Sequence, residues 1–195
     1  VDRPETLDEA LEGCTDVVYL VHRMGEGTDY EVAERRAATH LAEAAARARV
    51  ERIVYLGGVA PANGEVSKHL RSRLATGEIL RAGTVPTVEL RAGMLVGYGS
   101  ESWRIVRDLA ARLPVMLLPR WLDNRNQPLA IEDAVVALTH ALTLETDGSV
   151  VYDIPGPEAL SSREVLVRIA RLRGIATVMI GVPVVTPWLS SQVST

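Results

Sequence analysis

The sequence predicts an α/β fold built on a doubly wound parallel sheet. Short apolar runs alternate along the chain with longer amphipathic segments, and this order is typical of βαβ units. The run from Asp16 to His22 is almost continuously apolar, as expected of a parallel strand that is covered on both faces. With 195 residues, the chain is long enough for one domain with a sizeable core.

Three strands and three helices are predicted for the first half of the chain. Two of the helices begin at capping boxes, formed by Thr6 with Glu9 and by Thr28 with Glu31. Small residues recur on one face of the second helix, which suits close packing on a sheet. The predicted helices are 6–12, a long helix from Thr28, and 67–81; the predicted strands are 16–22, 52–56 and 86–91.

The second half is predicted to continue the same alternation. Residues 113–128 are expected to be irregular because they carry three prolines. The other predicted elements are a glycine-spaced loop at 93–99, a helix at 101–112, an extended piece at 129–131, a helix at 132–144, a strand at 150–154, a helix capped by Ser161 or Ser162 that ends near Gly174, and a strand at 177–180. We expect residues 1–182 to form one domain, and 183–195 to be a linker or the start of a C-terminal domain.

Composition excludes several classes of partner. The net charge of −4 gives no reason to expect nucleic acid or an anionic membrane surface. No apolar run approaches the roughly 20 residues of a membrane-spanning helix, and no signal peptide is visible. Cys14 is the single cysteine, so no disulfide can form within the chain, and we expect a reducing, cytoplasmic location.

Candidate binding residues follow the predicted strands at the point where each strand ends. Ligands of open α/β sheets bind beyond the carboxyl ends of the strands, and glycine there lets a ligand approach the backbone. The alternatives are a solvated strand end or a plain turn. The candidates are Val21, His22 and Arg23 after the first strand, Gly57 and Gly58 after the second, and Ala92, Gly93 and Met94 after the third.

The helix predicted at 67–81 carries His69 and Arg73, which are four residues apart and so share a face. Histidine can exchange a proton near pH 7, whereas arginine stays cationic and can bind a ribose or a phosphate. The alternative is a solvated helix face, since Lys68 and Arg71 lie beside the pair.

Other polar and aromatic residues give weaker indications. Asp123, Asp133 and Asp153 are not spaced as metal ligands on one element, and we expect no metal site. Trp103 and Trp121 could line a substrate cavity, although ordinary packing is the commoner role of tryptophan.

Taken together, these segments resemble a short-chain dehydrogenase/reductase (SDR), with a Rossmann-like sheet. The phrases that carry the resemblance are Val18-Tyr19-Leu20-Val21-His22, Tyr55-Leu56-Gly57-Gly58, Ser67-Lys68-His69-Leu70-Arg71-Ser72-Arg73, Glu89-Leu90-Arg91-Ala92-Gly93 and Arg112-Leu113-Pro114-Val115-Met116. They are most similar to the atypical, NmrA-like branch, which includes homologues of a complex I accessory subunit. The resemblance implies binding of NAD or NADP and an unknown small-molecule substrate.

The resemblance also shows two departures from the family pattern. The family's Tyr-x-x-x-Lys pair falls on His69 and Arg73, so an active protein would use a non-standard His/Arg pair, and the family's serine after the second strand is replaced by glycine. The family's first strand and its Gly-x-x-Gly-x-x-Gly turn have no counterpart before Val1. About 60 residues of the pattern, two βα units of about 30 residues each, are therefore expected to be lacking.

That gap leads to an expectation about the sheet and to alternatives for function. Residues 16–22 should form an exposed apolar edge, which is a liability for a monomer, unless a preceding segment or a partner chain covers it. One functional hypothesis is an NAD(P)(H)-binding oxidoreductase, with His69 as proton donor and Arg73 as ribose anchor. Another is a non-catalytic dinucleotide sensor or assembly subunit, and a third is a fragment with no activity of its own.

Overall fold

A parallel four-stranded sheet is the centre of the first of two compact units in the chain. The computed structural model describes residues 3–22, 30–60, 66–112, 115–119, 123–175 and 178–182. The first unit comprises residues 1–93 and 132–154, and the second comprises residues 94–131 and 155–195. Each unit is described separately below.

The sheet of the first unit runs in the order β1–β2–β3–β8, with every neighbouring pair parallel. Its strands are β1 (Asp16–Tyr19), β2 (Arg52–Gly58), β3 (Thr87–Ala92) and β8 (Val150–Ile154). The register pairs Tyr19 with Tyr55 and Gly58 with Ala92, so the carboxyl ends of the strands share one edge of the sheet. The predicted α/β class with a parallel sheet is confirmed.

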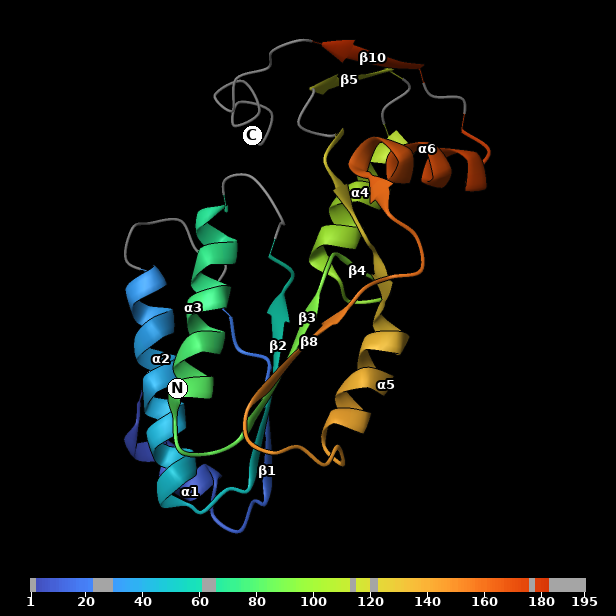
Figure 1. Cartoon of the computed structure of the whole chain (residues 1–195). Helices are drawn as coiled ribbons and strands as arrows, with labels where there is room; N and C mark the ends of the chain where they lie inside the picture. The colour runs from blue at the N-terminus through green and yellow to red at the C-terminus, as the bar shows by residue number, and fades with distance from the viewer. Residues whose placement is uncertain are drawn as a thin grey trace. The chain divides into compact units, whose positions relative to one another are not determined.

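Helices cover both faces of this sheet, as Figure 1 shows. The helices of the unit are α1 (Glu5–Ala10), α2 (Tyr30–Arg47), α3 (Lys68–Ala82) and α5 (Ile131–Ala141), of which Ile131 is assigned to the second unit. α2 and α3 lie side by side on one face, and α5 lies on the other (Figure 1). The small-residue stripe predicted for the second helix is buried, including Ala37, Ala44 and Ala45.

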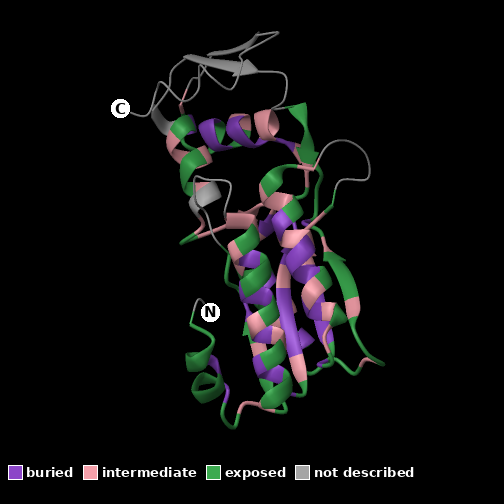
Figure 2. Cartoon of the chain, turned by 90° about the vertical axis from the view of Figure 1, so that its left-hand side faces the viewer, coloured by how far each residue is buried: buried purple, intermediate pink, exposed green. Residues whose placement is uncertain are grey.

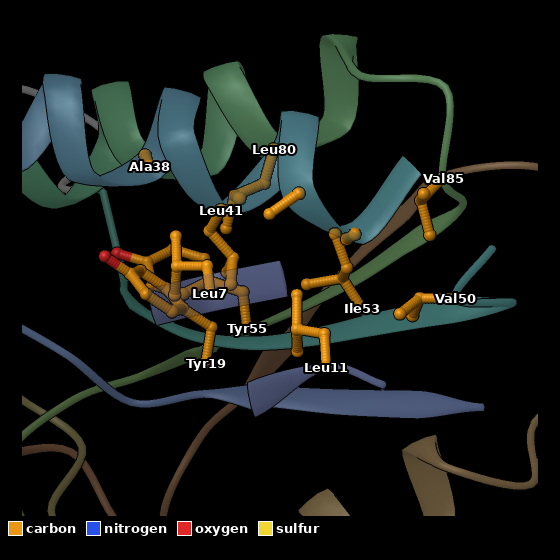
Figure 3. Packing of buried hydrophobic residues seen from close by; sticks show 12 residues of the cluster. Leu7, Leu11, Tyr19, Ala38, Leu41, Val50, Ile53, Tyr55, Leu80 and Val85 are labelled. Atoms are coloured by element: carbon orange, nitrogen blue, oxygen red, sulfur yellow. The ribbon is translucent and has the colours of Figure 1, made fainter. Parts of the chain in front are cut away.

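Two apolar clusters fill the space between the helices and the sheet. Between the sheet and α2, Leu41 meets Ile53 and Tyr55 of β2, together with Leu80 of α3 (Figure 3). On the α5 face, Val54, Val88 and Leu90 pack against Ala141. β2 and β3 therefore bury side chains on both faces, as expected of parallel strands that helices cover on both sides.

β1 lies at the edge of the sheet and pairs only with β2 among the described strands. Tyr19 is buried, but Val18, Leu20 and Val21 are 40%, 51% and 49% exposed. The strand ends at Tyr19 rather than at the predicted residue 22. The expected exposed apolar edge is confirmed by these exposed fractions. Figure 2 colours each described residue by how far it is buried.

In its described residues, the second unit has two helices and three pairs of short strands. Its helices are α4 (Glu101–Arg112) and α6 (Ser162–Leu172), and its strand pairs are β4 (Leu95–Val96) with β7 (Leu129–Ala130), β5 (Val115–Pro119) with β10 (Val178–Val182), and β6 (Arg125–Asn126) with β9 (Leu160–Ser161). The expectation that 113–128 is irregular was wrong for β5 and β6, since both strands pair with segments far along the chain. Ser161 is the α6 cap and forms a capping box with Glu164.

A buried carboxylate lies where α3 crosses the sheet. Glu89 of β3 is 0% exposed and forms ion pairs with Arg81 of α3 and with Arg91, whose Nε lies 2.8 Å from Glu89 Oε1. Gly77 of α3 provides the space, because a Cβ atom there would lie 2.4 Å from Glu89 Oε2. The glycine in the middle of this helix is therefore required by the buried charge and not by a turn.

Replacing Gly77 with alanine tests this packing. At an exposed helical site, glycine to alanine raises the free energy of unfolding by about 1 kcal/mol. For Gly77→Ala we expect the opposite sign, a decrease of about 1–3 kcal/mol, because the new methyl group overlaps a fixed carboxylate. Denaturant titration measures the change, with the exposed Lys68→Ala on the same helix as control. An unchanged or higher free energy of unfolding would contradict the packing.

Candidate functional site

The candidate site lies at the carboxyl edge of the four-stranded sheet. β2 ends at Gly58 and β3 at Ala92, and these residues are register partners. The two segments stay paired just beyond β2, since Val59 N–H donates to the carbonyl of Ala92 at 3.2 Å. His22 follows β1 on the same edge, so residues predicted from three separate strand ends are brought together.

Arg73 is held against the end of β2 by two hydrogen bonds. Its Nη2 donates to the carbonyl of Leu56 at 2.7 Å, and the hydroxyl of Tyr55 donates to the carbonyl of Arg73 at 2.9 Å. Its Nε is buried and has no hydrogen-bond partner among the described residues. Arg73 is half-buried, so the alternative of a fully solvated helix face does not describe it.

His69 lies one helical turn before Arg73 and faces His22. The centroids of the two imidazole rings are 6.2 Å apart in an edge-to-face arrangement. Partial burial, and then the positive charge of Arg73, lower the pKa of His69 below its ordinary value of 6.5; His22 acts in the same direction and Glu34 in the opposite one. His69 is therefore a neutral imidazole at pH 7, with one N–H donor and one acceptor nitrogen.

The glycines at the end of β2 have a packing reason of their own. A Cβ atom on Gly58 would lie 2.7 Å from Leu70 Cδ1 of α3, and one on Gly57 would lie 3.0 Å from Glu89 Oε1. A side chain on Gly58 would displace the Leu70 side chain of α3, whereas one on Gly57 would press against Glu89 of β3. That these glycines let a ligand approach the backbone stays a prediction from the sequence.

The remaining predicted residues divide into three groups. Val21 is exposed at the β1 edge, and Gly93 follows β3 as the last residue of that segment of the first unit. Met94 begins the second unit and packs there against a cluster that contains Ala110 and Ile169. Arg23 lies outside the described residues, as does Trp121.

Sequence reasoning missed two polar residues beside the site. Glu34 of α2 is 5% exposed and accepts a hydrogen bond from the hydroxyl of Ser72 of α3, which is also buried. Its negative charge raises the pKa values of His69 and Tyr55, although burial is the largest cause at each of those residues. The signal was present in the sequence, because Glu34 falls on the same helical stripe as Ala38 and Leu41.

Some kinds of site are not found in the described part of the chain. Those residues contain no cluster of three or more histidine, cysteine or acidic side chains placed to hold a metal ion. No helix among them combines the length and the apolar character needed to cross a membrane.

Solved structures identify the kind of fold. The sequence matches no protein-family model, and no curated protein is significantly similar to it. MoeE5, in complex with UDP-glucuronic acid and NAD, is 21% identical with a TM-score of 0.74, and the match covers 91% of this chain and 68% of MoeE5. The Bordetella bronchiseptica enzyme WbmG, in complex with NAD, is 18% identical with a TM-score of 0.75, covering 98% of this chain and 69% of WbmG.

A third structure, the UDP-N-acetylglucosamine 4-epimerase from Bacillus cereus, is 19% identical with a TM-score of 0.75, covering 93% of this chain and 70% of the epimerase. These proteins are SDR enzymes, so the chain has an SDR-type fold, as the motifs predicted. At such low identity the likeness concerns the fold alone.

The pKa of His69 provides a test of the site's geometry. Titration of its ring protons by NMR should give a pKa below 6.5, and Arg73→Gln should raise that pKa, because it removes the nearby positive charge. Arg71→Gln removes the same charge from an exposed position on α3 and should leave the pKa of His69 unchanged. Equal shifts of the His69 pKa in Arg73→Gln and Arg71→Gln would contradict a specific interaction between His69 and Arg73.

The same shift fixes the sign of a pH effect on stability. Because the pKa of His69 is lower in the folded than in the unfolded chain, the unfolded chain binds more protons between those two values. The contribution of His69 to the free energy of unfolding is therefore complete above about pH 6.5. It is lost as the pH falls below that value. His69→Gln should remove that part of the pH dependence of the free energy of unfolding.

Proposed function

We propose that this chain is an NAD(P)(H)-binding, oxidoreductase-like domain of the SDR type. The observation that carries the proposal is the meeting of His22, His69 and Arg73 at the carboxyl edge of a parallel sheet with an SDR-type fold. That edge is where open α/β sheets bind their ligands. The presence of NAD in the structures of MoeE5 and WbmG supports the same cofactor class here.

The residues present fit part of such a cofactor. Arg73 has a buried Nε without a partner and a guanidinium fixed by Leu56, so a ribose hydroxyl or a phosphate oxygen could accept its remaining hydrogen bonds. His69 and His22 would line the same space, since their rings face each other. A bound nicotinamide supplies hydride transfer, and His69 can hold or release the accompanying proton near neutral pH.

A non-catalytic role is the second candidate, and a specific observation favours it. The SDR pattern pairs a tyrosine with a lysine, but here Tyr55, a phenol beside the site, is buried and donates to the carbonyl of Arg73. Burial raises the pKa of Tyr55, so its hydroxyl keeps its proton. A dinucleotide sensor or assembly subunit of the NmrA-like kind would need the binding residues and not a proton donor.

The exposed edge of the sheet supports a proposal about partners. Val18 of β1 and the two residues after the strand, Leu20 and Val21, are apolar and half-exposed, and β1 has one described neighbour. A further strand, from another segment or from a partner chain, would bury them and pair the free backbone groups of β1.

Cofactor titration tests the proposed site. Addition of NADH or NADPH to the 195-residue chain should quench tryptophan fluorescence in a saturable way. Arg73→Gln should weaken binding about tenfold or more, because hydrogen bonds to a charged group contribute about 1.5–3 kcal/mol. Arg73→Lys, which restores the charge, should recover part of the loss. Arg71→Gln is the matched control, and a loss as large as that of Arg73→Gln would contradict the assignment.

Turnover separates the two candidate functions. If the chain is an enzyme, NAD(P)H oxidation with a panel of carbonyl compounds and quinones should be detectable and should fall at least 100-fold in His69→Ala, in line with the usual contribution of about 10²–10⁴ from a general acid. Cofactor binding without turnover across the panel would favour the sensor. The absence of binding by either nicotinamide nucleotide in a folded sample would reject both.

A further inference from the structure

Two histidine side chains meet at the carboxyl edge of the four-stranded sheet, within the first unit. His22 follows β1, and His69 lies in the first turn of α3. The centroids of their rings are 6.2 Å apart, in an edge-to-face arrangement. No local sequence pattern predicts this pair, because the two residues are far apart in the chain and meet only in the fold. Imidazole is the commonest protein ligand of transition-metal ions, so the pair is a candidate metal site.

A contact with the backbone indicates which nitrogen of His22 is free to bind. Its Nδ1 lies 3.3 Å from the carbonyl oxygen of Leu20. A carbonyl oxygen can only accept a hydrogen bond, so Nδ1 carries the proton of the neutral ring and Nε2 carries the lone pair. Metal-binding histidines commonly donate their other ring N–H to a backbone carbonyl in this way. The fold therefore favours the form of His22 that a metal ion needs.

His69 supplies a second imidazole in its neutral form. Partial burial and the positive charge of Arg73 lower the pKa of His69, and a metal ion binds only the deprotonated ring nitrogen. The guanidinium of Arg73 is directed to the β2 backbone, where its Nη2 donates to the carbonyl of Leu56 at 2.7 Å. The negative charge of Glu34 also reaches His69 and partly offsets that of Arg73.

The separation of the two rings suits one shared ion after a small adjustment. Zinc lies about 2.0–2.1 Å from a histidine nitrogen, so two tetrahedral ligands have their ring centres about 5 Å apart. The observed 6.2 Å is about 1 Å longer. Rotation of the His69 side chain can close that difference while His22 keeps its contact with Leu20. The described residues hold no cluster of three metal-binding side chains, so the other coordination positions fall to water or an anion.

We propose that His22 and His69 together bind one divalent transition-metal ion, of the zinc class. Nε2 of His22 is one ligand and a ring nitrogen of His69 is the other. Mg²⁺ and Ca²⁺ do not suit the pair, because both ions prefer oxygen ligands. Structural zinc sites use four protein ligands, so a site with two binds its ion reversibly and leaves positions open to a small molecule.

A bound ion would lie where the two histidines line the proposed cofactor site. Zn²⁺ and NADH should therefore compete, and the metal ion would act as an inhibitor of cofactor binding. This consequence rests on the proposed function, whereas the ion site itself does not.

Calorimetric titration of Zn²⁺ into the 195-residue chain, prepared without an affinity tag, tests the site. At neutral pH we expect saturable binding of one ion per chain, and no binding of Mg²⁺ at the same concentrations. His22→Ala and His69→Ala should each weaken Zn²⁺ binding at least tenfold. The double variant should be little weaker than either single variant, because the two ligands act as a unit.

Control variants assign the binding to this pair. His140→Ala removes an exposed histidine from α5 and should leave the Zn²⁺ affinity unchanged. Cys14→Ser tests binding through the single cysteine, which lies before β1, and should also leave the affinity unchanged. Arg73→Gln should tighten Zn²⁺ binding, because it removes a nearby positive charge, although the same change should weaken NADH. His22 is exposed, so its Tm easily excludes a folding defect in His22→Ala.

The outcomes separate this inference from the proposed function. Absence of Zn²⁺ binding in a folded sample, or equal Zn²⁺ affinities in the wild type, His22→Ala and His69→Ala, would overturn the inference, even if the sample binds NADH. Loss of Zn²⁺ binding in Cys14→Ser or His140→Ala, with the other two variants unaffected, would also overturn it. Zn²⁺ binding that needs both histidines in a sample that does not bind NADH would support the ion site and reject only the proposed function.

Discussion

The close approach of α3 to β2 and β3 is the constraint on which the first unit depends. Glycines stand at two of the close contacts: a Cβ atom on Gly58 would lie 2.7 Å from Leu70 Cδ1, and one on Gly77 would lie 2.4 Å from the buried Glu89 Oε2. Because the helix lies this close, Arg73 reaches the carbonyl of Leu56, and His69 is carried to the carboxyl edge of the sheet. The same packing therefore forms both the core and the candidate site.

Buried charge makes this arrangement specific. A carboxylate such as that of Glu89 is costly to bury unless it is paired, and removing one partner of a buried pair is strongly destabilising. Arg81 and Arg91 provide the pairing from α3 and from β3. On the other side of α3, Glu34 bonds to Ser72 and links α2 to the helix that carries the site. The two carboxylates therefore connect α3 to β3 and to α2.

Where the SDR pattern has a Tyr/Lys pair, this chain has His69 and Arg73, and the two side chains differ in whether they can exchange a proton. Arg73 is anchored to the β2 backbone and cannot release a proton, so it can only bind and orient. Proton exchange would then depend on His69, whose pKa reflects its burial and three charged or titratable neighbours: Arg73, Glu34 and His22. Those neighbours come from α3, α2 and the segment after β1, so the electrostatics of the site belong to the fold as a whole.

What the sequence determined by itself was local: the alternation of strands and helices, a helix cap at Ser161 or Ser162, and the edge where His22, Gly58 and Ala92 meet. These follow from short-range periodicity and from the rule that parallel strands end together. The tertiary structure alone decided the pairing of β5 with β10, the buried partners of Glu89 and the place of Glu34 beside His69. No local pattern encodes these contacts, because β5 with β10 and Glu34 with His69 are far apart in the sequence, and the burial of Glu89 depends on how α3 packs on the sheet.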